Sequence, residues 1–490
     1  MSTDSHNPTL LWFRRDFRLT DNPALAAAIE RGAPILPIYV YAPEEENPWA
    51  PGGASKWWLH HALQDIQQQL RSVGLELLIQ RSTNTLETLQ QLIHESNAGA
   101  LYWNRLYEPA IIERDQTIKQ TLNQENRVEV RSFNGALLHE PHTISNKSGT
   151  PYKVFTPYWK AIQPLPVDEP VRVPLSDAIP FEDSRPDGLP LEDLSLLPRI
   201  RWDEGIQGTW DPTREGARKQ CQHFLDQKAS RYPKDRDYPS VEGTSRLSPY
   251  LHYGQIGPRE IVEWTGGLNP EDKGALSFIR EVVWREFGHH LLYHFPHTPT
   301  EPLQPDFAHF PWEEDPDALK RWQKGATGFP IVDAAMRELW ETGWMHNRAR
   351  MIVASFLVKD LRITWLEGAK WFWDTLVDAD LANNTLGWQW AGGCGADAAP
   401  YFRVFNPTRQ ATKFDPKGEY IARYCPELAK LPVPERFAPW EASESALHDA
   451  GVQLGTTYPK PMVDHAEARK AALQAYEKLK YLREKKSPNS

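Results

Sequence analysis

Short apolar segments alternate with helix-like segments through the first 133 residues, and this alternation limits the possible folds more than any other feature. The predicted strands are residues 10–13, 35–41, 75–80, 100–103 and 128–133, and the predicted helices between them are residues 22–31, 55–73, 85–96 and 110–124. Strands separated by helices are typical of a parallel sheet with helices on both faces. Residues 1–134 are therefore predicted to form a Rossmann-like, doubly wound α/β domain with a mostly parallel sheet.

The turn after the first predicted strand runs from Arg14 to Arg18 and lacks the glycine-rich pattern G-x-G-x-x-G. That pattern lets a dinucleotide diphosphate approach the backbone, so a dinucleotide is not expected on this domain by the usual route. Trp58, Trp103, Asn104 and Glu108 lie near the predicted strand ends, where they could border a ligand or serve as packing and loop residues.

The rest of the chain changes character twice. Residues 135–212 are rich in proline and acidic residues, which predicts a long connector crossing the surface of both domains. From residue 213 onward the hydrophobic spacing becomes helical, so residues 213–490 are predicted to form an all-helical domain. Its clearest helices are predicted at residues 270–292, 330–343, 345–361 and 364–377, and a basic helix is predicted at about residues 463–486.

Composition excludes several classes of protein. The 490 residues contain only three cysteines, which are too few for a disulfide framework and fit a reducing cytoplasm. No spacing typical of metal ligands is evident, and no apolar run has the length of a signal peptide or a membrane span. The net charge of −10 by itself argues against a nucleic acid partner, although a local basic patch can override the total.

Residues 378–390 contain two aspartates, two asparagines and two tryptophans, and a glycine-rich turn follows. Ionisable groups close to indoles are costly to bury without partners, so the segment predicts a site rather than core. Residues two apart point to nearly opposite sides in either a helix or a strand, so Trp388 and Trp390 are expected to point in different directions. Trp312, Trp322, Trp365 and Trp388 could form an electron conduit, or each could simply pack in the core.

A second cluster, residues 243–248, joins a glycine, three hydroxyl residues and Arg246 before a predicted helix near Pro249. Backbone amides at a helix start, with hydroxyls beside them, suit a phosphate. Runs of serine and threonine also cap helices without binding any ligand.

On the predicted helix 270–292, Glu281, Trp284, Arg285 and Gly288 share one face. A carboxylate, an indole and a glycine in a row leave room for a flat ligand. The alternative is a surface pair of Glu281 and Arg285 over a packing tryptophan.

At the start of the predicted helix 345–361, Asn347, Arg350 and Met351 share a face. A buried arginine needs an acidic partner, and Asp378 and Asp380 are the candidates. A single structural ion pair would explain Arg350 equally well. Taken together, the clusters suggest a flavin-like pocket for a ring and a diphosphate within a helical domain.

These motifs resemble those of the photolyase/cryptochrome family. The resemblance rests on residues 242–248, Trp284 to Phe287, Thr342 to Arg348 and 378–407, and it covers nearly the whole chain. Within the family the sequence is most similar to bacterial cyclobutane pyrimidine dimer (CPD) photolyases, and residues 52–58 are similar to the folate-type branch.

The resemblance implies that a U-shaped FAD binds to the helical domain and not to the sheet domain. The implied FAD-binding residues are Tyr232, Thr244, Ser245, Arg246, Leu247, Ser248, Asn347, Arg350, Asp378, Asp380 and Asn384. Asn384 would lie at flavin N5, where plant-type cryptochromes carry aspartate, so it favours repair. Trp388, Trp365 and Trp312 would form the photoreduction chain, with Trp388 nearest the flavin.

The resemblance also implies the substrate, a pyrimidine dimer flipped out of UV-damaged DNA; photolyases are among the enzymes known to flip bases. The implied DNA or lesion contacts are Arg236, Glu281, Trp284, Arg285, Asn347, Arg348, Met351, Trp390 and Arg403. Light-excited reduced FAD would pass an electron to the dimer, with Glu281 steadying the radical anion. DASH-type cryptochromes usually have tyrosine in place of Trp390, so Trp390 favours duplex DNA.

The resemblance leaves two questions open. A cryptochrome-like photoreceptor without repair activity is the alternative function, and a (6–4) photolyase is disfavoured because Asn347 and Met351 replace that branch's usual histidine pair. The expected antenna chromophore is 5,10-methenyltetrahydrofolate, with 8-hydroxy-5-deazaflavin as the alternative, near Trp58, Asn104 and Glu108. The protein is expected to be a cytoplasmic, nucleoid-associated bacterial monomer that binds no membrane and no metal.

Overall fold

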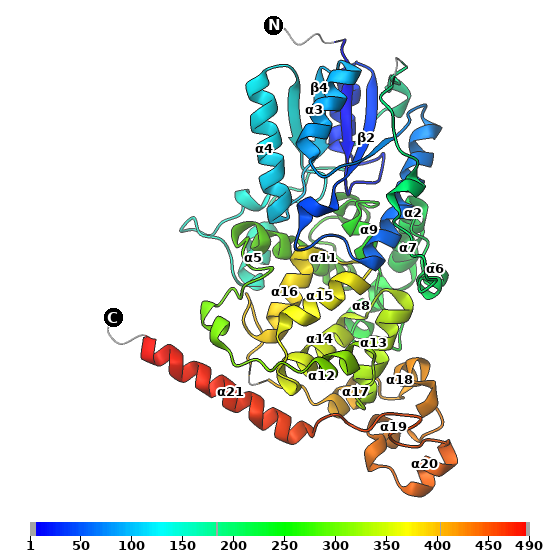
Figure 1. The fold of residues 1–490 in the computed structure, drawn as a ribbon, viewed down its shortest axis with the longest axis vertical. Coiled ribbons are helices and arrows are strands. Elements are labelled where there is room, and N and C mark those ends of the chain that lie inside the picture. The colour runs from blue at the N-terminus through cyan, green and yellow to red at the C-terminus, as the bar shows by residue number, and fades with distance from the viewer. Residues whose placement is uncertain (1–5, 183–184, 402, 487–490) are drawn as a thin grey trace.

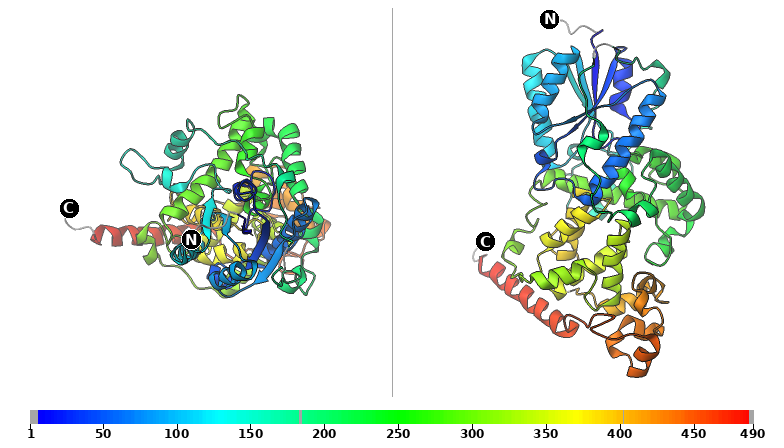
Figure 2. Two further views of the ribbon diagram at one scale, coloured as in Figure 1. Left: turned by 90° about the horizontal axis from the view of Figure 1, so that it is seen from above. Right: turned by 45° about the vertical axis from the view of Figure 1, so that its right-hand side comes forward.

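The computed structural model describes residues 6–182, 185–401 and 403–486. It has two bodies stacked along the long axis of the molecule, a sheet domain next to the N-terminus and a larger helical body below it (Figure 1). The right-hand view of Figure 2 shows the same division, with α20 (Glu444–Ala450), in orange, at the end away from the sheet.

The sheet domain confirms the predicted doubly wound fold. Its strands are β1 (Thr9–Phe13), β2 (Ile35–Tyr41), β3 (Leu78–Arg81), β4 (Ala100–Asn104) and β5 (Glu129–Phe133). They pair in the order β3-β2-β1-β4-β5, and every pairing is parallel. The helices are α1 (Pro23–Glu30), α2 (Gly53–Ser72), α3 (Thr85–Ser96) and α4 (Pro109–Glu125).

The alternation of side chains along β1 explains why both faces are covered. Leu11 and Phe13 belong to one hydrophobic cluster with residues of α1 and α2, whereas Leu10 and Trp12 belong to another with residues of α3 and α4. All four side chains are buried, as expected for a central parallel strand.

The second body is built from helices, as predicted. Two α-helices of the described residues between 135 and 212 pack against it: α5 (Phe155–Ile162) contacts α11, and α6 (Glu204–Thr209) contacts α13. The others are α7 (Arg214–Gln227), α8 (Tyr232–Asp235), α9 (Ser248–His252), α10 (Pro258–Trp264), α11 (Lys273–His294), α12 (Pro316–Gln323), α13 (Pro330–Thr342), α14 (Asn347–Ser355), α15 (Trp365–Thr375), α16 (Leu381–Gly392), α17 (Pro407–Phe414), α18 (Glu419–Tyr424), α19 (Val433–Phe437), α20 and α21 (His465–Lys486). No described helix is long and apolar enough to cross a bilayer.

One predicted helix proved to be composite. The segment 345–361 forms α14 and then a π-helical turn, Phe356–Asp360. The hydrophobic pattern does not separate these two forms, because a π turn shifts the register by only one residue. Such turns are frequent at functional sites.

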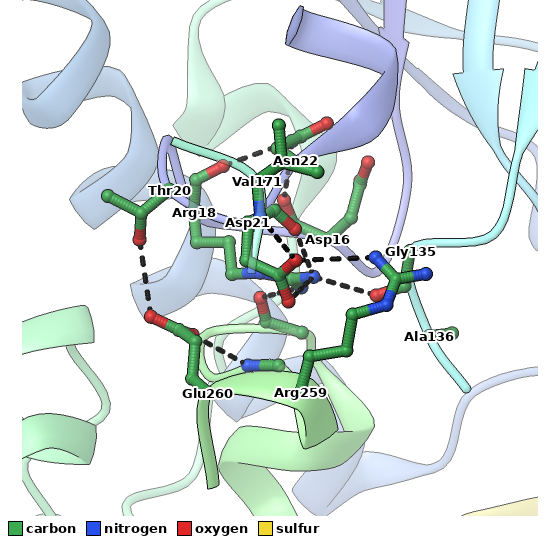
Figure 3. Close-up of polar contacts among 12 residues, drawn as sticks. Asp16, Arg18, Thr20, Asp21, Asn22, Gly135, Ala136, Val171, Arg259 and Glu260 are labelled. Atoms are coloured by element: carbon green, nitrogen blue, oxygen red, sulfur yellow. Dashed lines mark hydrogen bonds and ion pairs between the residues drawn. The ribbon is translucent and has the colours of Figure 1, made fainter. Parts of the chain in front are cut away.

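The arginine-rich turn after β1 joins the two bodies (Figure 3). Arg18 is 1% exposed, and it donates to the carbonyl oxygens of Gly135 at 2.7 Å and of Gly254 at 2.8 Å. Asp21 lies 3.3 Å from Arg18 and 3.3 Å from Arg259 of α10. Buried charges of this kind fix a geometry because each one needs its partner. The turn therefore fixes the sheet domain against the helical body.

Candidate active site

A cavity of about 590 Å³ opens into the helical body. Its walls come from α8, α9, α11, α14 and α16 and from the loop before α9. The volume lies in the range of ligand sites, which is roughly 300–1,000 Å³. Polar side chains from distant parts of the chain line the cavity. This arrangement is expected of a binding site.

One wall carries the ion pair that the sequence suggested for Arg350. Its Nη2 lies 3.0 Å from Oδ1 and 2.8 Å from Oδ2 of Asp378. The Ser248 hydroxyl donates to Asp378 Oδ2 at 2.6 Å, and Arg350 Nε donates to the Met345 carbonyl at 2.8 Å. The first residue of α9 is thereby tied to Arg350 of α14 through one carboxylate.

Asp380 has a different environment although it is only two residues away. Its Oδ1 accepts from the Asn383 backbone N–H at 2.8 Å and so caps α16. Its Oδ2 lies 3.4 Å from His252 Nδ1 and 3.5 Å from His289 Nε2. Burial opposes ionisation, but the nearby His289 and His252 outweigh it and hold the pKa of Asp380 well below its usual value. Asp380 therefore faces the cavity as a carboxylate.

Asn384 lies one helical turn beyond Asp380 and also lines the cavity. Its Nδ2 donates to the Ala369 carbonyl of α15 at 3.0 Å, which fixes the orientation of the side-chain amide. The half-buried side chain still has a carbonyl oxygen that can accept a hydrogen bond.

Trp388 is the most deeply buried of the cavity's indoles, at 2% exposure. It packs edge-on against Phe372, with ring centroids 4.9 Å apart, and its Nε1 is buried without a hydrogen-bond partner among the described residues. Gly368 of α15 makes this position possible, because a Cβ there would lie 2.0 Å from the Trp388 ring. Trp390 is only half-buried but lines the same cavity as Trp388. The two indoles, which the spacing predicted to point in different directions, therefore border one space and differ mainly in how deeply they are buried.

Glu281, Trp284 and Met351 line the cavity and are each partly exposed, so we call this part of it the mouth. Glu281 forms an ion pair with Arg236 and keeps about a third of its side chain exposed. The Trp284 ring stacks on Phe155 of α5, with centroids 3.8 Å apart and planes 9° from parallel. That stack fixes the indole of Trp284 so that it can present an aromatic wall.

A second hollow of about 440 Å³ adjoins the mouth. We name it the basic groove after its cations, which are Lys234, Arg348, Arg403, Arg409 and Lys413. Arg348 and its partner Asp237, 2.6 Å apart, line both hollows. The groove therefore continues directly from the cavity.

The sheet domain contains a smaller cavity of about 60 Å³ next to the helical body. Its lining includes Trp12, Tyr39, Glu46, Arg114 and Trp373. The expected antenna residues lie elsewhere. Trp58 and Asn104 are buried and donate to Gln255 and Asp16, and Glu108 forms an ion pair with Arg15.

Sequence models of two families match the chain. "FAD binding domain of DNA photolyase" matches residues 278–478, and "DNA photolyase" matches residues 9–174. A protein of Agrobacterium fabrum named deoxyribodipyrimidine photo-lyase is 43% identical, over 96% of this chain and 98% of its own length. The chain belongs to the DNA photolyase/cryptochrome family. This confirms the resemblance drawn from the motifs.

Both branches of the photolyase/cryptochrome family are similar to the chain. Cryptochrome-2 of Arabidopsis thaliana is 38% identical, over 95% of this chain and 78% of its own length. Among solved structures, a bacterial class III photolyase from Agrobacterium tumefaciens is 43% identical with a TM-score of 0.93, covering 97% of this chain and 98% of that one.

The structure brings together most of the residues that the family motifs suggested. All those expected at the FAD line the cavity, as do all those expected at the lesion except Arg403, which lines the basic groove. Trp365 is buried at the start of α15 and Trp312 is half-buried against Phe310, with ring centroids 4.4 Å apart. Neither of these two tryptophans lines the cavity.

Several residues were missed by sequence reasoning. His252 and His289 lie beside Asp380, and Phe155 lies behind Trp284, but each contact joins residues far apart in the chain. For Arg409 and Lys413 a signal existed, because cations four residues apart share one face of a helix.

Proposed function

We propose that the protein is a deoxyribodipyrimidine photo-lyase that uses light and reduced FAD to repair cyclobutane pyrimidine dimers in DNA. The observation that carries this proposal is the continuity of the cavity with the basic groove through Arg348 and Asp237. A flavin pocket alone would suit any member of the family, whereas a cationic groove at its mouth suits a phosphodiester strand.

The cavity residues fit FAD. A diphosphate needs donors, and the Thr244–Ser248 loop offers backbone amides and hydroxyls at the start of α9, along with Arg246, whose Nε is buried without a partner. A flavin ring needs donors and acceptors along one edge, which Arg350, Asp380 and Asn384 supply. Tyr232, Asn347 and Asp378 complete the proposed set. When bound, FAD supplies the light absorption and the one-electron chemistry.

The protein contributes binding, orientation and a dry environment. Asp378, held by Arg350 and Ser248, fixes the loop that carries the phosphate donors. Asn384, fixed by the Ala369 carbonyl, presents a polar group at the ring. Trp388, Trp365 and Trp312 are proposed to carry electrons between the cavity and the surface.

At the mouth, a flipped dimer would lie between the indoles of Trp284 and Trp390, with Met351 beside it. Glu281 would accept hydrogen bonds from the pyrimidine N–H groups and stabilise the reacting bases. Flanking phosphates would contact Arg236, Arg285, Arg348 and Arg403, with Asn347 near the lesion. A damaged, poorly stacked site lowers the cost of flipping.

For the antenna we propose 5,10-methenyltetrahydrofolate, with 8-hydroxy-5-deazaflavin as the alternative. Trp58, Asn104 and Glu108 are occupied by internal partners. The proposal therefore places the chromophore at the 60 Å³ cavity beside Trp12 and Trp373, where side chains would have to move to admit it.

The same proposal divides the chain into an antenna domain (1–134), a connector (135–212) and a helical FAD domain (213–490). It places a monomer in the bacterial cytoplasm, associated with the nucleoid when bound to DNA. The second candidate is a cryptochrome-like photoreceptor without repair activity, which the similarity to a plant cryptochrome favours.

Counting dimers tests the two candidates against each other. Purified protein with reduced FAD is incubated with duplex DNA that contains cyclobutane dimers, under blue light and in the dark. Loss of dimers only in the light supports repair. FAD that is photoreduced while the dimers persist would overturn repair and support the photoreceptor.

A further inference from the structure

Arg246 lies over two indoles. Its guanidinium carbon is 4.6 Å from the ring centroid of Trp210 and 4.8 Å from that of Trp344. Both indoles are buried, with 9% and 8% exposure. A desolvated cation over an aromatic face is attracted by the ring, so each contact stabilises this position of the guanidinium.

No carboxylate lies within ion-pair distance of the Arg246 guanidinium among the described residues, and its buried Nε has no hydrogen-bond partner. Arg246 opposes the rise that burial causes in the pKa of Glu338, but that carboxyl already accepts from Tyr420 Oη and from the His346 backbone N–H. Arginine carries five N–H donors and cannot lose its charge, so a half-buried position without an acceptor is costly. Arg246 lines the large cavity, where an anionic ligand would supply the missing acceptors.

The backbone at Arg246 is held in an unfavourable conformation. Its φ is +52°, a left-handed value that costs a residue with a side chain about 1 kcal/mol or more. Such a conformation persists only where the surroundings impose it. The contacts of the side chain with the two indoles are one such constraint, and the hydrogen bond from Gln220 of α7 to the Ser245 carbonyl, at 2.9 Å, is another.

Both indoles are anchored at the end of α13. Trp344 follows Gly343, which ends that helix with φ +66°. Trp210 lies just after α6, far away in the sequence, but its Nε1 donates to the Thr342 carbonyl at 2.8 Å. The two rings thus share one support, and Trp210 itself does not line the cavity.

We propose that Trp210 is a positioning residue for the FAD diphosphate. We call Trp210, Arg246 and Trp344 together the indole clamp. In it the two indoles hold the Arg246 guanidinium, and the left-handed turn at Arg246, in position to bind an anion. This inference rests on the proposed function. It adds that a residue outside the cavity, in the connector, controls how tightly the cofactor is held.

The rate of FAD release tests the clamp, measured by the rise in flavin fluorescence when the holoprotein is diluted. Arg246→Met and Trp210→Leu are each expected to release FAD about tenfold faster than wild type. Arg246→Met removes the cation that would bind the diphosphate, and Trp210→Leu removes one desolvated cation–π contact that holds this cation. The double variant is expected to match Arg246→Met alone, because Trp210 acts through Arg246. Trp210→Phe keeps an aromatic face and is expected to stay within about threefold of wild type.

Trp49→Leu is the matched control, because Trp49 is equally buried, at 8%, but lines neither the cavity nor the clamp. It should lower thermal stability without changing FAD release.

The clamp would be overturned if Trp210→Leu released FAD at the wild-type rate, if Trp49→Leu released it as fast as Trp210→Leu, or if the effects in the double variant simply added. Should Trp210→Leu fail to fold, Trp210→Met takes its place in the cycle, because it keeps a long apolar side chain but removes the aromatic face under Arg246. Wild-type protein that does not retain FAD would instead contradict the proposed function.

Discussion

The turn after β1 (residues 14–18) and the loop before α9 (residues 243–247) both carry arginine and other polar groups, yet only the loop borders a large cavity. In the turn, every arginine has a partner within the protein: Arg14 pairs with Asp115 at 2.7 Å, Arg15 with Glu108, and Arg18 with Asp21. In the loop, Arg246 has no carboxylate partner among the described residues and faces about 590 Å³ of space. The Nε atoms of Arg14 and Arg18 also lack hydrogen-bond partners, so the difference lies in the missing carboxylate and the open volume beside Arg246. A ligand site is thus marked by a cation without a carboxylate partner next to a large cavity, and not by polar residues alone.

This difference explains why the family can bind a dinucleotide without a glycine-rich loop on its sheet. At the strand ends, where such a ligand would normally bind, side chains of the turn join the two bodies (Figure 3), and the cavity beside them measures only about 60 Å³. The helical body provides the open volume instead.

The largest expected effect is a loss of stability when the turn after β1, which joins the two bodies, is changed. Arg18→Met leaves Asp21 with only Arg259 and leaves the Gly135 and Gly254 carbonyls without this donor. Breaking a buried ion pair typically costs about 3–5 kcal/mol, so chemical denaturation should show a loss of that size. Arg172→Met is the control, since Arg172 is 85% exposed beside Glu263 and its loss should cost less than about 1 kcal/mol. Equal losses in the two variants would mean that the turn is not a structural joint.

A smaller effect is expected at Glu286 of α11, whose carboxylate accepts from the backbone N–H of Leu138 at 2.9 Å. Burial raises the pKa of Glu286 to about 7, although Arg285 opposes the shift. Since the folded pKa lies above the unfolded value, the native state binds more protons, and stability should fall as pH rises from about 4.5 to 7.

Glu286→Gln should flatten this part of the pH–stability curve, by up to about 3 kcal/mol. Denaturation measured at several pH values checks this, with Glu271→Gln at an exposed position as the control. A curve that keeps its slope in Glu286→Gln would show that another group is responsible.

At the mouth of the cavity, Glu281→Gln should slow dimer repair by about 10- to 100-fold, the loss expected for one charge-assisted hydrogen bond. FAD content should stay at the wild-type level, because Glu281 pairs with Arg236 and not with the groups of the inner wall. Repair rates and flavin absorbance of the same preparation give both values. Loss of FAD from Glu281→Gln, with none from Glu263→Gln, would place Glu281 at the cofactor and not at the lesion.

The smallest effect is expected in the basic groove. Lys413→Ala should weaken binding of dimer-containing duplex only a few-fold, and the slope of log affinity against log salt should fall by about 0.9. Lys370→Ala lies outside the groove and pairs with Glu367, so it should change neither value. An unchanged slope for Lys413→Ala would exclude a phosphate contact at that position.

The sequence predicted local features better than distant contacts. The strand order could not be read directly, but the alternation of segments was enough for the doubly wound fold. The face with Glu281, Trp284 and Arg285 followed from helical spacing, and the pairing of Arg350 with Asp378 or Asp380 followed from charge. The family motifs supplied the roles assigned to these residues.

Contacts between remote segments were not predictable. His252 lies 128 residues from Asp380 along the chain, and Trp210 reaches Arg246 only because α6 packs against α13. The assignment of Trp58 and Asn104 to the antenna stays a prediction. Both are buried by contacts that the sequence does not show, because Trp58 of α2 donates to Gln255 of the helical body and Asn104 at the end of β4 donates to Asp16.

A crystal structure of the protein with FAD and a duplex containing one cyclobutane dimer would test the central claim most directly. We expect flavin density in the large cavity between Asp378 and the loop before α9, and the flipped dimer between Trp284 and Trp390 beside Glu281. Flavin density at the strand ends of the sheet domain, or a dimer that stays stacked in the duplex away from the cavity mouth, would contradict it.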